Sequence, residues 1–194
     1  MLYKKLVLVL ILSATLFSQN FILENENVIG EKAVQQIEII GKEFYKKTSL
    51  PIYLVAVTKL DGKKVTTYIK DYAQKLQPPF VILLIAKEDK KIDILVNSKE
   101  TISLDKDYVL DDIIIPILVT KSKKNSTISK NSAALLSGYS EIAEQIAESK
   151  DVELVNAIGN DSKNFIYWFR IFIYSTMFVV LIYYLYHKRK NRTK

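Results

Sequence analysis

IYLVAVTKL, at residues 52–60, is an almost unbroken apolar run that is rich in β-branched side chains. FVILLIA, at residues 80–86, is a second run of the same kind. Runs of this length without polar alternation are typical of strands that are buried on both faces of a sheet. A turn at residues 61–62 and a helical pattern over residues 64–76 lie between them, and Pro78-Pro79 ends the helix. This order predicts a crossover between two parallel strands.

Further elements surround this crossover. The charged residues 87–90 separate the second run from the apolar residues 92–96, which predicts a hairpin. Glu31–Lys47 and Ser132–Ser149 carry apolar side chains at spacings of three and four residues, so each predicts an amphipathic helix. The two stripes are Ala33, Ile37, Ile40 and Phe44, and Leu135, Tyr139, Ile142 and Ile146. The expected fold class is α/β, a mixed β-sheet flanked by helices in an α/β/α sandwich.

The rest of the middle segment has a less regular pattern. Tyr108–Val119 is apolar after an acidic start, and we expect Pro116 to interrupt or kink it. Lys121–Lys130 is polar and basic, which is typical of a solvated loop and also of a segment that contacts anionic lipids or a partner. We expect residues 150–164 to form a juxtamembrane spacer.

Residues 1–18 have the architecture of a signal peptide. Lys4 and Lys5 precede a short apolar run, and small residues follow that run. Such a segment directs export of the chain, and the alternative is an uncleaved N-terminal anchor.

Residues 165–186 form an apolar run with one charge, Arg170. A helix needs about 20 apolar residues to cross a bilayer, so this run predicts one C-terminal transmembrane helix. Aromatic side chains mark both of its ends, and Arg170 can reach the headgroups. The residues expected at the membrane interfaces are Tyr167, Trp168, Arg170, Tyr183, Tyr184 and Tyr186.

Basic residues flank both apolar ends and predict the topology. They are Lys4, Lys5, Lys188, Arg189, Lys190, Arg192 and Lys194, the last five within the basic tail of residues 187–194. We expect this tail in the cytoplasm, a single pass through the bacterial inner membrane after signal cleavage, and the middle domain in the periplasm. The lipid bilayer is then the first expected partner.

The charge distribution argues against a nucleic-acid partner. The net charge is +7, but residues 19–163 hold 20 Lys, no Arg and 21 acidic residues, a net charge of −1. A nucleic-acid-binding domain needs a basic patch on its own surface. The chain has no Cys, and its one His is His187 in the tail. Thiolate zinc sites and nucleophile systems that need His are therefore excluded from the middle domain.

Two stretches of the chain resemble the TPM domain family. KTSLPIYLVAVT, at residues 47–58, with YIKDYA at residues 68–73, is similar to the family's helix ending near TG, its QIAVVTV strand and its helix containing YA. FVILLIA, with KKIDI at residues 90–94, is similar to the family's GVLLLIAPKDRKIRIEVG. The resemblance covers residues 28–149 and implies a divergent TPM-like extracytoplasmic domain. Many family members also carry a C-terminal membrane helix.

Two glycine-containing motifs of the family are changed in this chain. LQPP, at residues 76–79, stands where the family often has GNNGVLLL, and NSKE, at residues 97–100, stands in place of GYGLE. Glycine at such sites permits positive φ or a close approach to a ligand. We therefore expect a domain that acts by protein interaction in the cell envelope, with a membrane or envelope protein as partner and without catalysis. The alternative hypothesis is a divalent-metal-dependent phosphatase.

The candidate metal ligands for that alternative are Asp105, Asp107, Asp111 and Asp112. Clustered carboxylates supply the oxygen ligands that Ca²⁺ prefers, although these residues do not match the EF-hand loop. Within the resemblance, the family's acidic position before an apolar helix corresponds to Asp105, Asp111 or Asp112. In the competing interpretation, these aspartates cap the following helix and complement its dipole, and the domain needs no cofactor.

Overall fold

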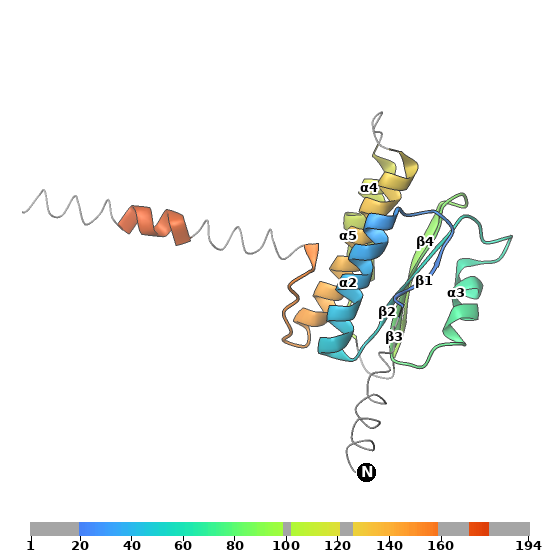
Figure 1. Ribbon diagram of the computed structural model, residues 1–194, viewed down its shortest axis with the longest axis horizontal. Coiled ribbons are helices and arrows are strands. Elements are labelled where there is room, and N and C mark those ends of the chain that lie inside the picture. Colours follow the sequence, from blue (N-terminus) through green and yellow to red (C-terminus); the bar gives the residue numbers. More distant parts are fainter. Residues whose placement is uncertain (1–19, 99–101, 121–125, 159–170, 179–194) are drawn as a thin grey trace, which may run out of the picture.

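The computed structural model of the chain describes residues 20–98, 102–120, 126–158 and 171–178. Its centre is a four-stranded sheet in the order β1-β2-β3-β4 (Figure 1). The strands are β1 (Ile22–Asn25), β2 (Ile52–Val57), β3 (Phe80–Ala86) and β4 (Lys91–Asn97). β1, β2 and β3 are parallel, and β4 is antiparallel to β3. The predicted parallel crossover, hairpin and mixed sheet are therefore confirmed.

Helices cover both faces of the sheet (Figure 1). α2 (Glu31–Thr48) and α5 (Thr127–Glu148) pack against each other on one face, together with the π-helix η1 (Tyr108–Ile114) and α4 (Ile115–Val119). α3 (Val65–Ala73) covers the opposite face. This arrangement confirms the expected α/β class with helices on both sides of a mixed sheet.

The two central strands divide the core into two clusters. Alternate residues of β2 from Ile52 onward face the α2–α5 layer, and those from Tyr53 onward face α3. In β3, alternate residues from Val81 onward face the α2–α5 layer, and alternate residues from Phe80 onward face α3. Every residue of both strands is buried, as the continuous apolar runs predict. The predicted stripes of α2 and α5 are also buried.

The two crossovers between parallel strands have opposite hands. α2 joins β1 to β2 and α3 joins β2 to β3, and both connections step in the same direction across the sheet. Because α2 and α3 pack on opposite faces, the two connections cannot share one hand. Parallel crossovers are right-handed in about 98% of cases, so one of these two has the rare hand.

β2 is shorter than the sequence pattern predicts, ending at Val57 rather than Leu60. The backbone N–H of Leu60 donates a hydrogen bond to the carboxylate of Asp89 at 2.6 Å. Thr58 and Lys59 are the polar residues of the predicted run, and the strand ends directly before them.

α5 begins at Thr127, so the loop prediction for Lys121–Lys130 is wrong over its last four residues. The hydroxyl of Ser126 accepts a hydrogen bond from the N–H of Ser129 at 3.1 Å. Serine at this position satisfies an N–H that the first helical turn leaves without a partner, which favours the earlier start. Residues 121–125 lie outside the described part of the chain.

The predicted interruption at Pro116 is confirmed. η1 gives way to α4 at Ile115, and Pro116 lies in the first turn of α4. Proline has no N–H, so the regular hydrogen-bond ladder of a helix cannot run through it. The change from π-helix to α-helix at this position follows from that break.

β1 is an element that the sequence pattern does not predict. Its four residues are half-buried, and its pairing with β2 shifts register between Ile22 and Glu24. The sheet therefore begins before residue 28, where the resemblance begins.

Candidate functional site

The carboxyl ends of β1, β2 and β3 meet at one edge of the sheet, where open α/β folds commonly bind ligands. The carboxylate of Glu26, after β1, accepts a hydrogen bond from the N–H of Thr58 at 2.6 Å. The N–H of Glu26 donates to the carbonyl of Ala56 at 2.9 Å. Glu26 therefore ties the loop after β1 to the end of β2.

The turn between β3 and β4 is tied to the loop after β2 in a similar way. Asp89 accepts the hydrogen bond from Leu60, and the carboxylate of Glu88 lies 3.1 Å from the ammonium of Lys59. The hydrogen bond and the charge of Glu88 raise the pKa of Lys59. Glu26, Glu88 and Asp89 are thus all engaged in holding neighbouring loops together.

An apolar groove of about 600 Å³ lies beside this edge, between the β3–β4 hairpin and the α4–α5 layer. The strands contribute Ile85 and Ile92, and α4 contributes Ile115, Leu118 and Val119. Ile115 is 37% exposed and Val119 is 68% exposed. The groove therefore has a floor that includes the buried Ile85, and its rim carries the exposed aliphatic side chains Ile115 and Val119.

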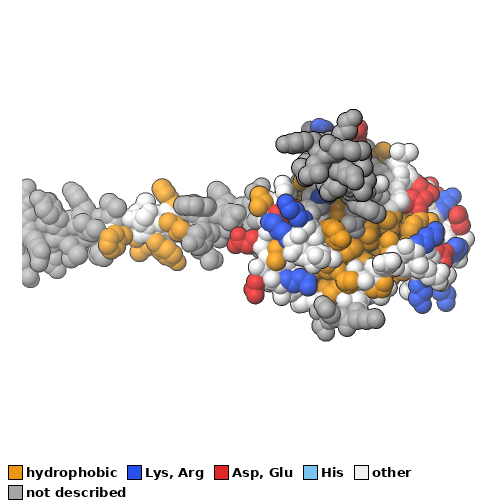
Figure 2. All heavy atoms as spheres, turned by 60° about the horizontal axis from the view of Figure 1, so that its bottom comes forward, with side chains coloured by type: hydrophobic (Ala, Val, Ile, Leu, Met, Phe, Trp, Pro, Cys, Tyr) orange, Lys and Arg blue, Asp and Glu red, His pale blue; other side chains and the backbone are white. Residues whose placement is uncertain are grey.

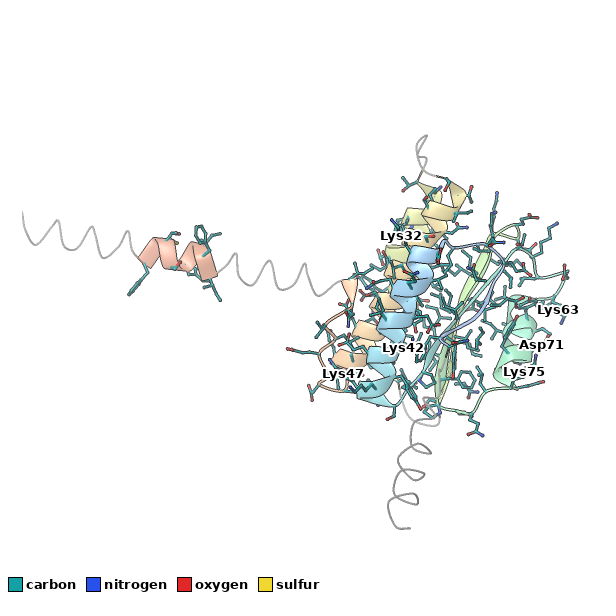
Figure 3. All side chains as sticks on the ribbon, viewed as in Figure 1. Lys32, Lys42, Lys47, Lys63, Asp71 and Lys75 are labelled. Carbon is teal, nitrogen blue, oxygen red and sulfur yellow. The ribbon has the colours of Figure 1, made fainter. Side chains whose placement is uncertain are left out.

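Four lysines also line this groove. Lys87, Lys90 and Lys91 come from the β3–β4 turn and the start of β4, and Lys130 comes from α5. The salt bridges among the described residues join Glu43 to Lys47, Glu88 to Lys59 and Asp71 to Lys63, so they involve none of the four. Figure 3 shows Lys63 and Asp71 on the α3 side of the molecule. The groove combines aliphatic walls with cationic groups that lack an anionic partner in the described ranges.

The four candidate metal ligands are exposed and follow one another into and along η1. The carboxylate of Asp105 accepts a hydrogen bond from the N–H of Tyr108 at 3.0 Å, and its own N–H donates to the side chain of Gln145 at 2.9 Å. Asp107, Asp111 and Asp112 occupy exposed positions beyond it. Across the described ranges, no three acidic or histidine side chains form a group that could hold a metal ion. The Ca²⁺ site stays a prediction, and Asp105 acts in this structure as a cap.

Asp112 lines a hollow of about 340 Å³ between the η1–α4 segment and α5. Glu141 and Glu144 line the same hollow. The hydroxyl of Ser140 lies 3.3 Å from the carboxylate of Glu144 and accepts a hydrogen bond from the N–H of Ile158 at 2.7 Å. Asp112 is therefore the sequence-predicted aspartate that shares a hollow with further carboxylates.

Residues 152–158, within the expected spacer, pack against α2. The carboxylate of Glu43 accepts hydrogen bonds from the N–H groups of Val155 at 2.7 Å and Asn156 at 2.9 Å, and from the side-chain amide of Asn156 at 2.7 Å. Leu154 and Ala157 are buried. The structured domain therefore extends past residue 149.

Lys47 completes this anchor, which consists of Glu43, Lys47, Val155 and Asn156. Its ammonium lies 2.7 Å from the Glu43 carboxylate and donates to the carbonyl of Glu153 at 2.7 Å, and Figure 3 shows it beside this segment. Burial acts to raise the pKa of Glu43, but the hydrogen bonds from Lys47, Val155 and Asn156 together outweigh it and lower the pKa from 4.5 to about 2. Glu43 is therefore ionised, and the segment is held by a charged acceptor.

The face at the amino ends of the strands has a different character. Figure 2 shows hydrophobic side chains gathered near its middle, with acidic and basic side chains both present around them. Tyr45, near the end of α2, is 39% exposed, and its ring lies 6.2 Å from that of Phe21. On the face in view, charges of both signs are interspersed rather than gathered into one basic field.

The predicted membrane-directed residues lie outside the described part of the chain. They are the interface residues Tyr167, Trp168, Arg170, Tyr183, Tyr184 and Tyr186, and the basic residues Lys4, Lys5, Lys188, Arg189, Lys190, Arg192 and Lys194. Residues 171–178, in the middle of the predicted span, are helical and exposed. Within the described ranges, no helix combines the length and the apolar character needed to cross a membrane.

A family model described as "TPM domain" matches residues 22–145. This chain belongs to the TPM domain family. The match includes all four strands of the sheet, β1 among them, and most of α5. The resemblance that the strand sequences indicate is therefore confirmed. A comparison with curated proteins found no match.

Two solved structures are similar to this chain. The N-terminal domain of the cg2496 protein from Corynebacterium glutamicum has a TM-score of 0.51 at 14% identity, covering 70% of this chain and 83% of that one. The BA42 protein from the psychrophilic bacterium Bizionia argentinensis has a TM-score of 0.46 at 18% identity, covering 70% of this chain and 97% of that one. The first of these shares the fold of this TPM domain.

Two features of this TPM domain escape reasoning from the sequence. The groove lysines are read as a charged turn and a basic loop, because nothing in the sequence indicates that residues 87–91 and Lys130 line one groove. The anchor at Glu43 joins residues more than one hundred positions apart. The exposed apolar Val119 beside a lysine-rich stretch is the one local signal of the groove.

Proposed function

We propose that this TPM domain is held outside the cytoplasm, at the bacterial inner membrane, and acts there by binding an envelope protein without catalysis. The proposed anchor is a transmembrane helix at residues 165–186. Its length, its aromatic ends and the basic tail after it support this location. The near-neutral charge of residues 19–163 supports a protein rather than a nucleic acid as partner.

The proposed binding role is supported by the contacts of the carboxylates at the carboxyl edge of the sheet, which are engaged in hydrogen bonds and an ion pair within the fold. Glu26 and Asp89 accept backbone hydrogen bonds at 2.6 Å, and Glu88 is paired with Lys59. Each of these groups fixes a loop, so the edge that usually hosts chemistry in α/β folds is built here as a rigid surface. A rigid surface binds a partner with little loss of conformational entropy.

Site-specific photocrosslinking in native membranes tests this proposal. Benzoylphenylalanine is placed in the full chain at Ile39, Tyr108 or Ile128, which are 45%, 42% and 42% exposed. We expect one envelope protein to be captured from at least one position, and not from the buried control position Ile142. The absence of a protein adduct at all three exposed positions would overturn the interaction role.

A divalent-metal-dependent phosphatase is the second candidate. The family model carries the name TPM phosphatase, and Asp112 lines a hollow together with Glu141 and Glu144. Of the candidate ligands Asp105, Asp107, Asp111 and Asp112, the hollow is lined by Asp112, so Ca²⁺ bound there would take oxygen ligands from Asp112 and from Glu141 or Glu144. This candidate rests on the carboxylates of the hollow rather than on the carboxyl edge.

The enzyme candidate has its own test with the purified full chain. Thermal melts with and without Ca²⁺, together with hydrolysis of p-nitrophenyl phosphate, are compared for the native chain, Asp111→Ala with Asp112→Ala, and the exposed control Glu153→Ala. Ca²⁺-dependent stabilisation and turnover that are lost only in the double aspartate variant would establish the phosphatase. Melts that are insensitive to Ca²⁺, with no turnover, would remove it.

A further inference from the structure

The groove between the β3–β4 hairpin and the α4–α5 layer is aliphatic along its length. Ile85 and Ile92 come from the sheet, and Ile115, Leu118 and Val119 come from α4. Val119 is 68% exposed although the helix that carries it packs on the core with other residues. Covering exposed aliphatic surface is favourable, so this groove gains free energy from an apolar occupant.

The cationic groups of the groove are available to an anion. The acidic residues nearest in sequence to Lys87, Lys90 and Lys91 are Glu88, Asp89 and Asp93. Asp93 lies on β4 between Ile92 and Ile94, which face the α2–α5 layer, so its side chain is on the opposite face of the sheet. Glu88 pairs with Lys59, and Asp89 accepts the hydrogen bond from Leu60. Lys90 is held with a φ of 52° at the tip of the turn. The turn therefore offers lysine side chains to the groove while its carboxylates face elsewhere.

The polar lining decides which kind of occupant fits. Apart from the four lysines, the polar residues among the described lining are Thr127 and Asn131. Asn131 is 5% exposed, and its amide donates to the carbonyl of Val28 at 3.4 Å. A peptide backbone brings N–H groups that need acceptors when they lose water, and the four lysine side chains supply none. An alkyl chain needs none.

We propose that this groove binds a single-chain anionic amphiphile, with the alkyl chain against Ile85, Ile92, Leu118 and Val119 and the anionic head at the lysines. The volume of about 600 Å³ lies within the range of small-ligand sites. The head can be a phosphate or a carboxylate, because lysine ammonium groups bind either as point charges. This inference does not depend on the envelope-protein role.

Photolabelling of the full chain in native membranes tests the proposal. The probes are a dodecyl phosphate, a dodecanoate and a dodecyltrimethylammonium, each with a diazirine at the end of the chain, and labelled peptides are located by mass spectrometry. We expect both anionic probes to label residues 85–92 or 115–119 at least about fivefold more than the cationic probe, since two or more ion pairs are gained. An excess of inorganic phosphate should not compete, because a free anion lacks the apolar chain.

Matched variants separate the groove from the rest of the surface. Lys90→Glu with Lys130→Glu should reduce anionic labelling about fivefold, and Lys42→Glu, an exposed lysine on α2, should not change it. Val119→Asp should also reduce labelling, whereas Val155→Asp, at a position that is 75% exposed, should not. Equal labelling by cationic and anionic probes would overturn the proposal. So would full competition by inorganic phosphate, or a protein segment or second copy found crosslinked from benzoylphenylalanine at Val119.

Discussion

Glu43 receives three hydrogen bonds from residues that lie 112 or 113 positions later in the chain. Its carboxylate is also paired with Lys47 one helical turn away. Hydrogen bonds to a charged acceptor are stronger than those between neutral groups, so Glu43 is a main contributor to the attachment of residues 152–158 to α2, beside the Lys47 bond to Glu153 and the burial of Leu154 and Ala157. Without it, the same backbone N–H groups would have to find water or remain without partners.

Glu43→Gln should lower the free energy of unfolding by about 1–3 kcal/mol, because a neutral amide accepts more weakly and leaves Lys47 without its partner. Urea denaturation of the full chain measures this change. The matched control is Glu153→Gln, whose exposed side chain lies in the same segment and should change stability by less than about 0.5 kcal/mol. Equal effects of the two substitutions would contradict the anchor.

The lowered pKa of Glu43 also predicts how stability depends on pH. Because the pKa falls from 4.5 to about 2 on folding, the contribution of Glu43 is complete above pH 4.5 and is lost as the pH falls toward 2. The difference in unfolding free energy between the native chain and Glu43→Gln should shrink over this window. Denaturation curves at a series of pH values measure it, and a difference that stays constant from pH 6 to pH 2.5 would show that Glu43 is not the titrating group.

At the scale of elements, the sequence predicts what local burial dictates and misses what distant contacts decide. β2 and β3 are read correctly because every residue of each is buried, which leaves a continuous apolar run. β1 has four half-buried residues and a register shift, so it carries no such pattern. The early start of α5 depends on one serine cap. The opposite hands of the two crossovers have no local signal at all.

The same limit applies to the candidate site. The aspartates from Asp105 to Asp112 are visible in the sequence as a cluster, and the structure places them on an exposed segment where Asp105 caps a helix. The groove is formed by the β3–β4 hairpin, one short helix and the start of another, and its lining residues lie up to 46 positions apart, from Ile85 to Asn131. In the sequence, the turn and the start of α5 each resemble an ordinary charged loop, and α4 resembles a short apolar segment.

The contact between η1 and α5 gives a prediction at this scale. A Cβ atom on Gly138 of α5 would lie 2.3 Å from Cδ1 and 2.4 Å from Cγ1 of Ile114. Gly138→Ala should therefore destabilise the protein by about 1–3 kcal/mol, although alanine favours a helix by about 1 kcal/mol. Urea denaturation measures the change. In the double variant with Ile114→Ala, the loss should be smaller than the sum of the two single losses, and additive effects would refute the steric contact.

At the scale of the whole molecule, residues 152–158 belong to the same folded body as the sheet and its helices. The family match ends at residue 145, and the packing of Leu154 and Ala157 continues beyond it. The structured body is therefore longer than the part that the resemblance predicts. The remaining length up to the proposed membrane helix is correspondingly shorter.

The proposed topology gives the prediction for the whole chain. Alkaline phosphatase, which is active in the periplasm, should be active when fused after Ile158 and inactive when fused after Lys194. A fluorescent protein that folds in the cytoplasm should show the reverse pattern. Truncation after residue 164 should release the domain from membranes into the soluble periplasmic fraction. Phosphatase activity after Lys194 would reverse the orientation, and a truncated chain that stays with the membrane would remove the anchor.

The attachment of residues 152–158 to α2 has a consequence for distance. If residues 152–158 stay attached to α2 and residues 165–186 lie in the bilayer, the linker between domain and membrane consists of residues 159–164. Six residues reach at most about 20 Å even when fully stretched. Release of the chain from residue 150 onward would give fifteen residues and a reach of about 50 Å. If the proposed anchor holds, the attachment in which Glu43 takes part therefore limits the height of the domain above the bilayer, and a partner must present its own surface within that height.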